Sequence, residues 1–190
     1  MKNKYLISLI TTVIASFSFA SEFDELKSLL DQNLNEEAVE RINHYADANP
    51  DSSHTAFLEG FLALNQQNWD QAVELLKKAN DLESENSMFL SKLALAYIRK
   101  ADHAQPTEQP MLYMTGVDYF KKAEALDESN IEAQMALIGF YSHAPAMVGG
   151  SMQKAYEHAE ILMKYNKDLG TQQVAQLDQK AGKVAEAGQE

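Results

Sequence analysis

Small and apolar residues recur along this chain at a helical spacing, and the recurrence itself repeats. Within each segment the positions are i, i+4, i+7 and i+10, which lie on one face of a helix. The sets are Ala38, Ile42, Tyr45 and Ala48; Ala72, Leu76, Ala79 and Leu82; Gly116, Phe120, Ala123 and Leu126; and Met152, Tyr156, Ala159 and Leu162. The second set follows the first by 34 residues, the third follows after 44 and the fourth after 36, so the pattern predicts four structural repeats.

A second helix is expected before each of these segments, so every repeat contains two helices. A period of 34 residues with two helices per unit resembles the tetratricopeptide-repeat family, over roughly residues 22–166. Small and aromatic residues of the first helices also match the family pattern: Gly60, Ala94, Tyr97 and Tyr141. Three positions where the family often has tryptophan hold other residues: Ala56, Leu90 and Gln134.

The resemblance implies an all-α fold, a right-handed TPR-like superhelix of about four helix-turn-helix repeats plus a C-terminal capping helix. The expected ranges are 21–52, 53–86, 87–130 and 131–166 for the repeats, and 167–190 for the capping helix and tail. Small residues such as Gly60, Ala72 and Ala123 let neighbouring helices approach closely. The segment 101–110 lengthens the third repeat. It contains Pro106 and Pro110, and we expect it to form a bulging loop.

The first twenty residues differ from the rest of the chain. Lys2 and Lys4 precede an apolar run that starts at Tyr5, and the stretch ends in Ser18-Phe19-Ala20, with small residues where a signal peptidase cleaves. The pattern predicts a signal peptide over 1–20. The apolar run is shorter than the ~20 residues of a membrane-spanning helix. We therefore expect export to the periplasm of a Gram-negative bacterium, without membrane insertion of the mature chain.

The charge and the lack of cysteine narrow the function classes. The net charge is -12 at pH 7, and an acidic chain repels nucleic acid, so we expect no nucleic-acid partner. The sequence has no cysteine, which excludes disulfides, thiolate metal sites and a lipid-modified cysteine after the signal peptide.

The concave face of a tetratricopeptide array is lined by the first helix of each repeat and binds peptide segments. The resemblance places the candidate peptide-binding groove at Phe57, Phe61, Leu64, Asn65, Ser91, Leu95, Ile98, Arg99, Met135, Ser142 and His143. Most of these residues are apolar, and Arg99 and Asn65 are too few polar groups for a carboxylate clamp. Phe57 and Phe61 lie four residues apart on one helix face, and we expect both rings to be exposed on the concave side.

A glycine pair stands between the two expected helices of the fourth repeat, in the stretch APAMVGGSMQKA. Gly149, Gly150, Ser151 and Lys154 could hold an anion at a helix N-terminus, because backbone amides and a lysine converge there. The same residues suit a tight turn between helices, with Ser151 as the N-cap of the second helix. The sequence favours this structural interpretation.

Signatures of catalysis and of metal binding are missing from the sequence. It has no nucleophile elbow, Walker loop or HExxH helix, so we expect no enzymatic activity and no cofactor. The five histidines show no i, i+4 pair, and we expect no metal site. Met111 and Met114 could bind Cu(I) through their thioethers, but methionines at this spacing more often fill gaps in a core, which is the interpretation we favour.

These observations predict a non-enzymatic scaffold of the bacterial cell envelope that binds a protein or peptide segment. One alternative is an accessory or solute- or metal-binding component of an envelope transport system. A buried polar cluster would favour that alternative, and an open apolar groove favours a peptide ligand. A third possibility is a structural or assembly element whose C-terminal helix fills the groove.

Overall fold

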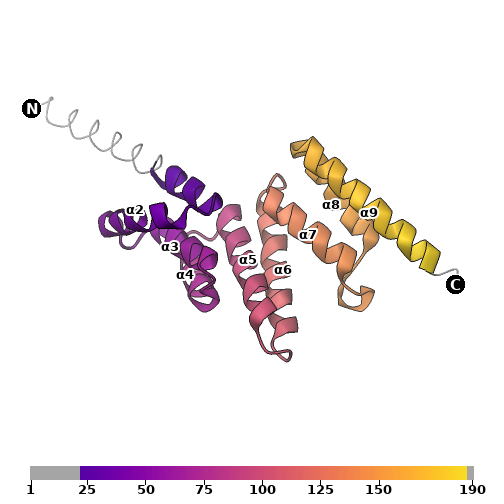
Figure 1. Cartoon of the computed structure of the whole chain (residues 1–190), viewed down its shortest axis with the longest axis horizontal. Coiled ribbons are helices and arrows are strands. Elements are labelled where there is room, and N and C mark those ends of the chain that lie inside the picture. Colours follow the sequence, from indigo (N-terminus) through magenta and orange to yellow (C-terminus); the bar gives the residue numbers. More distant parts are fainter. Residues whose placement is uncertain (1–21, 188–190) are drawn as a thin grey trace, which may run out of the picture. The chain divides into compact units, whose positions relative to one another are not determined.

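The computed structural model describes residues 22–187, and the regular elements of this range are all helices (Figure 1). These residues form two compact units that divide between Leu82 and Glu83. The all-α fold predicted from the spacing of apolar residues is confirmed. The predicted signal peptide over 1–20 lies outside the described residues.

The first unit contains a helix over 22–31, followed by α2 (Asn35–Ala48), α3 (Ser53–Asn65) and α4 (Trp69–Leu82). α3 packs on both α2 and α4. A side chain at Gly60 of α3 would bring its Cβ within 2.8 Å of Leu76 Cγ on α4, so the two helices are in close contact there. Ala72 and Ala79 of α4 are fully buried, as the prediction of small contact residues requires.

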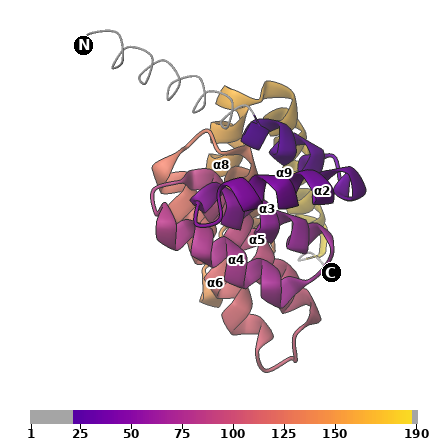
Figure 2. The same cartoon turned by 90° about the vertical axis from the view of Figure 1, so that its left-hand side faces the viewer.

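The second unit contains α5 (Ser87–His103), α6 (Gln109–Leu126), α7 (Ile131–His143), the short 3₁₀ helix η1 (Ala146–Val148), α8 (Met152–Tyr165) and α9 (Lys167–Ala187). Successive α-helices pack on each other from α5 to α9 (Figures 1 and 2). Their buried side chains form one core, to which α9 contributes Leu177. α9 therefore has the role of the predicted capping helix.

Polar residues before the helices fix where the helices begin. Ser52 Oγ accepts the amide of Thr55 at 3.0 Å ahead of α3, and Asn130 Oδ1 accepts the amide of Ala133 at 2.9 Å ahead of α7. Each contact satisfies a backbone donor of the first helical turn, which has no partner inside the helix. These N-cap residues thus fix the first residue of α3 and of α7.

The two flanking helices extend into both ends of the segment 101–110, so the bulging loop expected over the whole segment is limited to its middle part. α5 continues to His103 and α6 begins at Gln109, which leaves only 104–108 outside the helices. Pro110 occupies the first turn of α6, where a missing amide hydrogen costs no helical hydrogen bond. The insertion therefore lengthens both helices of the pair.

Candidate functional site

The two phenylalanines expected on the concave face lie in the core of the first unit. The exposed fraction is 0% for Phe57 and 4% for Phe61. The helix over 22–31 covers this side of α3, since the ring of its Phe23 lies 5.8 Å from that of Phe57 and 4.2 Å from that of His54, measured between centroids. The prediction of an exposed aromatic face is wrong because the apolar surface of α3 is buried against this first helix.

Three more of the predicted groove residues have structural roles. Leu64 is buried in the first unit. The side-chain amide of Asn65 donates to the carbonyl oxygen of Leu30 at 2.8 Å, which joins α3 to the end of the helix over 22–31. Ser91 is buried in the second unit, where its Oγ accepts a hydrogen bond from the side-chain amide of Asn130 at 2.9 Å. These three side chains hold helices together and do not line an exposed groove.

The capping helix covers the predicted groove residues at one face of α7. Met135, Ser142 and His143 line a pocket of about 720 Å³ whose opposite wall is α9. That wall consists mainly of glutamine side chains, with Gln172, Gln173, Gln176 and Gln179 among them. α9 therefore occupies part of the surface that the sequence assigned to a ligand.

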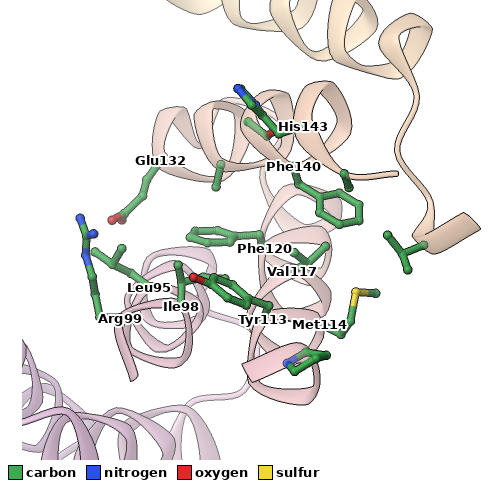
Figure 3. A pocket seen from close by; sticks show the side chains of 15 residues that line it. Leu95, Ile98, Arg99, Tyr113, Met114, Val117, Phe120, Glu132, Phe140 and His143 are labelled. Carbon is green, nitrogen blue, oxygen red and sulfur yellow. The ribbon is translucent and has the colours of Figure 1, made fainter. Parts of the chain in front are cut away.

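The remaining predicted residues, Leu95, Ile98 and Arg99 of α5, line a second pocket together with His143 (Figure 3). We term this cavity of about 740 Å³ the apolar pocket. Its other lining residues come from α6, α7 and the segment that contains η1: Pro110, Tyr113, Met114, Val117, Phe120, Glu132, Ala136, Gly139, Phe140, Ala144 and Val148. The structure thus brings three helices of the second unit together around one largely apolar cavity.

The long helices of the third repeat shape the apolar pocket. α5 has 17 residues and α6 has 18, whereas α7, which packs on α6, has 13. The first turns of α6 supply Pro110, Tyr113 and Met114 to the lining. Sequence reasoning missed them because second helices were assigned to the other side of the repeat. The sequence feature that could have indicated them is the run of large apolar residues directly after Pro110.

Methionines at this end of α6 are exposed. Met111 is 68% exposed and Met114 is 36% exposed, so the prediction that they fill the core is wrong. Met147 of η1 is 91% exposed, and the next residue, Val148, lines the apolar pocket. Two lining residues of the pocket, Met114 and Val148, are therefore partly open to solvent.

Polar groups stand at the edge of the apolar pocket. Arg99 Nη1 lies 3.7 Å from the carboxylate of Asp102, to which the hydroxyl of Tyr113 donates a hydrogen bond. That hydrogen bond raises the pKa of Tyr113, because it stabilises the protonated phenol. Glu132 pairs with Lys92 at 3.3 Å. These groups form ion pairs or hydrogen bonds within the protein and leave the interior of the pocket apolar.

Ser142 and His143 lie next to the pocket but do not form a nucleophile and base. His143 Nδ1 is 2.9 Å from the carbonyl oxygen of Gly139 and 2.9 Å from Ser142 Oγ. A carbonyl oxygen only accepts hydrogen bonds, so Nδ1 carries a proton and donates it there. This nitrogen cannot then take the proton of Ser142, as a catalytic base must.

The glycine loop has a structural role rather than the anion-binding role considered for it. The amides of Gly149, Gly150 and Ser151 donate to the carbonyl oxygens of Ala146, Pro145 and Tyr141, at 3.0, 3.1 and 2.8 Å. The amide of Lys154 donates to Ser151 Oγ at 3.3 Å, which confirms Ser151 as the N-cap of α8.

The geometry also explains both glycines and the lysine. Gly149 has a φ of 101°, a left-handed conformation that favours glycine, and a side chain at Gly150 would overlap the carbonyl group of Ala144. Lys154 Nζ lies 5.3 Å from the centre of the Tyr141 ring. Because the four amides have protein partners and the lysine lies over an aromatic ring, the loop offers no converging donors to an anion.

Gln134 and His158 form a polar pair inside the second unit. Gln134 stands at one of the positions where tetratricopeptide repeats often have tryptophan. Gln134 is fully buried, and its Nε2 donates to the carbonyl oxygen of Glu128 at 2.9 Å. Its Oε1 therefore faces His158 Nδ1, which donates to it at 2.7 Å. The His158 ring stacks on Tyr141 with 5.3 Å between centroids. Burial of the ring lowers the pKa of His158 below its ordinary value of 6.5.

The described part of the chain, 22–187, holds no group of three or more histidine, aspartate and glutamate side chains placed to bind a metal ion. The apolar pocket offers contact with apolar groups, and Arg99 and Glu132 lie at its edge.

The paired helices, their close contacts and the capping helix define a tetratricopeptide-type helical fold. A similar solved structure is that of a thermophilic tetratricopeptide-repeat protein from Thermus thermophilus, with a TM-score of 0.65 and 13% sequence identity over 88% of this chain and 94% of that chain. No protein-family model matches the sequence, and no curated protein matches it either. The resemblance read from the sequence is thus confirmed for the fold.

The buried position of Phe61 predicts a large effect on stability. Phe61→Ala removes a core ring and is expected to lower the free energy of unfolding by about 3–5 kcal/mol. Urea denaturation followed by circular dichroism measures this change. Lys78→Ala, on the exposed side of α4, is the control and should leave the unfolding midpoint nearly unchanged. A Phe61→Ala protein as stable as this control would contradict the assignment of the ring to the core.

His158 predicts a loss of stability in mild acid. Its pKa is lower in the folded protein than in the unfolded chain, so the unfolded chain binds more protons as the pH falls below 6.5. The free energy of unfolding should fall from pH 7.5 to pH 5, and the fall should be smaller in His158→Gln. His44→Gln, at an exposed position, should keep the wild-type pH dependence. Equal acid sensitivity in the two variants would contradict a role for His158.

Proposed function

We propose that the protein is a non-enzymatic scaffold of the bacterial cell envelope that binds a protein or peptide segment in the apolar pocket. The observation that carries the proposal is the pocket itself, whose lining is largely aliphatic and aromatic and whose volume is about 740 Å³. Binding sites are typically concave and apolar, with a few polar groups that orient the ligand. The tetratricopeptide-type fold supports a protein partner over a small solute.

The ligand that fits best is a segment with large apolar side chains. Phe120 is buried between the side chains of α5 and those of α7 at the base of the pocket, and the partly exposed ring of Tyr113 offers an aromatic surface to such a ligand (Figure 3). Arg99 and Glu132 lie at one side of the cavity and can bind polar groups of the same segment (Figure 3). Burial of the apolar contacts supplies the affinity, and the charged pair supplies orientation.

The alternative role in solute or metal transport has less support. It would require a polar cluster that a solute can reach. The polar groups of Gln134 and His158 instead bond to each other and to the backbone inside the second unit. A satisfied buried pair contributes to packing and specificity rather than to ligand binding.

The location in the cell envelope rests on residues 1–20. Their lysines, apolar run and small C-terminal residues are typical of a secretory signal peptide. Over 22–187, the chain forms no helix that combines the length and the apolar character needed to cross a membrane.

Gly139 offers a way to block the apolar pocket without disturbing the fold. A Cβ at this position meets no atom within 4 Å, and Gly139 lies in the wall of the pocket. Leucine there gains helix propensity over glycine and fills part of the cavity. We expect apolar peptides selected from a random-sequence phage library on the wild-type protein to bind Gly139→Leu at least ~10-fold more weakly, which is ~1.4 kcal/mol.

Two further variants complete this experiment. Gly182→Leu, also in a helix with no atom within 4 Å of its Cβ, should bind the selected peptides as the wild type does. Gly139 also borders the pocket under α9, whereas Val148 lines only the apolar pocket of the two, so Val148→Glu should weaken binding as well. Selection of peptides whose binding ignores both Gly139→Leu and Val148→Glu would refute the proposed site.

The proposed location predicts the form in which the protein is recovered. Expressed in a Gram-negative bacterium, the chain should appear in the periplasmic fraction with Ser21 as its first residue. A chain without residues 2–20 should remain in the cytoplasm. Recovery in washed membranes with the first twenty residues attached would contradict the proposal.

A further inference from the structure

The described part of the chain has three solvent-exposed methionines, two on α6 and one in η1. Met111, Met114 and Met147 are 68%, 36% and 91% exposed. The other methionines between 22 and 187 are each partly buried in a helix: Met88, Met135, Met152 and Met163. A reagent in solution should therefore reach Met111, Met114 and Met147 before the other four methionines.

One of the three exposed methionines lines the apolar pocket, and the other two are next to lining residues in the sequence. Met114 is a lining residue and lies at the edge of the pocket in Figure 3. Met111 directly follows the lining residue Pro110 on α6, and Met147 directly precedes the lining residue Val148. A ligand in the pocket therefore contacts Met114 and the backbone segments that carry Met111 and Met147.

Methionine at these positions introduces a reactivity that leucine would lack. The thioether is the only form of sulfur in this sequence, which contains no cysteine. Exposed thioethers are the ones that oxidants reach first, and the sulfoxide they form is polar and enzymatically reducible. Leucine would give a similar apolar surface without this chemistry.

We propose that Met111, Met114 and Met147 form a site of reversible oxidation that controls ligand binding in the apolar pocket. The inference rests on the proposed function of that pocket. The oxidant is a two-electron oxidant of the peroxide class. The sulfur attacks one peroxide oxygen, an S–O bond forms as the O–O bond breaks, and water leaves; the sulfur loses two electrons and the peroxide gains them. The resulting sulfoxides make the surface at the apolar pocket more polar and disfavour contact with the apolar side chains of a ligand.

The first measurement is the order in which the methionines react. The purified protein is treated with graded hydrogen peroxide, and each methionine is followed by peptide mass mapping. Met111, Met114 and Met147 should oxidise on the order of fivefold faster than the partly buried methionines. Oxidation of all methionines at one rate would overturn the proposed site.

The second measurement is binding, with the apolar dye 1-anilinonaphthalene-8-sulfonate and an apolar peptide selected on the wild-type protein as probes. Limited oxidation should weaken binding of both probes roughly tenfold while leaving the melting temperature unchanged, and methionine sulfoxide reductase should restore it. In the triple variant Met111→Leu, Met114→Leu, Met147→Leu, peroxide should leave the affinity for both probes at the value measured before treatment. The corresponding triple glutamine variant should bind weakly without peroxide.

The outcomes separate the control of binding from the binding function itself. If Gly139→Leu abolishes binding but oxidation leaves it unchanged, the pocket binds ligand and the proposed redox control is wrong. If the triple leucine variant loses binding on oxidation as the wild type does, the control lies elsewhere in the chain. If neither Gly139→Leu nor Val148→Glu affects binding, the proposed function fails, whatever the methionines do.

Discussion

Contact between paired helices at small side chains is the constraint on which the rest of the structure depends. In the second unit a Cβ on Gly116 of α6 would lie 2.8 Å from Ile98 Cδ1 and 2.9 Å from the carbonyl oxygen of Ala94 on α5. A larger residue would separate the pair and open the core behind it. The same contact fixes Ile98, whose side chain packs on Gly116 and also lines the apolar pocket. The packing of α5 on α6 therefore also determines the shape of the apolar pocket.

Once α5 and α6 are held together, their length determines where apolar surface remains uncovered. The insertion adds helix to both. The lining residues Tyr113 and Met114 of α6 follow it closely, and α7, which packs on α6, is the shorter helix. The connection after α7 then brings Val148 to the edge of the cavity. Its course depends on Gly149 and Gly150, which adopt a turn that other residues cannot. The glycine pair contributes to the site by shaping one edge of it.

The repeat pattern was predictable because it is local. A helix face is read from residues four and seven apart, and small residues at helix contacts recur at the repeat period. Which segment packs on a given helix face depends on the tertiary structure, and the local spacing of residues does not reveal it. Phe57 and Leu95 occupy equivalent faces of first helices, yet the helix over 22–31 buries Phe57, while Leu95 lines the apolar pocket. The α6 residues that line the pocket were missed because second helices were assigned to the other side of the repeat, and the repeat pattern does not show which part of a second helix borders a cavity.

α7 shows why the uncovered surface indicates a binding site. Its sequence is apolar around almost the whole circumference, which is typical of a helix that is buried on all sides. One face, with Leu137 and Tyr141, belongs to the core, and another, with Met135 and Ser142, lies under α9. The third face carries Ala136 and Phe140 and borders the apolar pocket. Ala136 and Phe140 pack against the core of the second unit and also line the pocket, so only part of this face is covered from within. Exposed apolar surface of this kind often marks a place that another molecule covers.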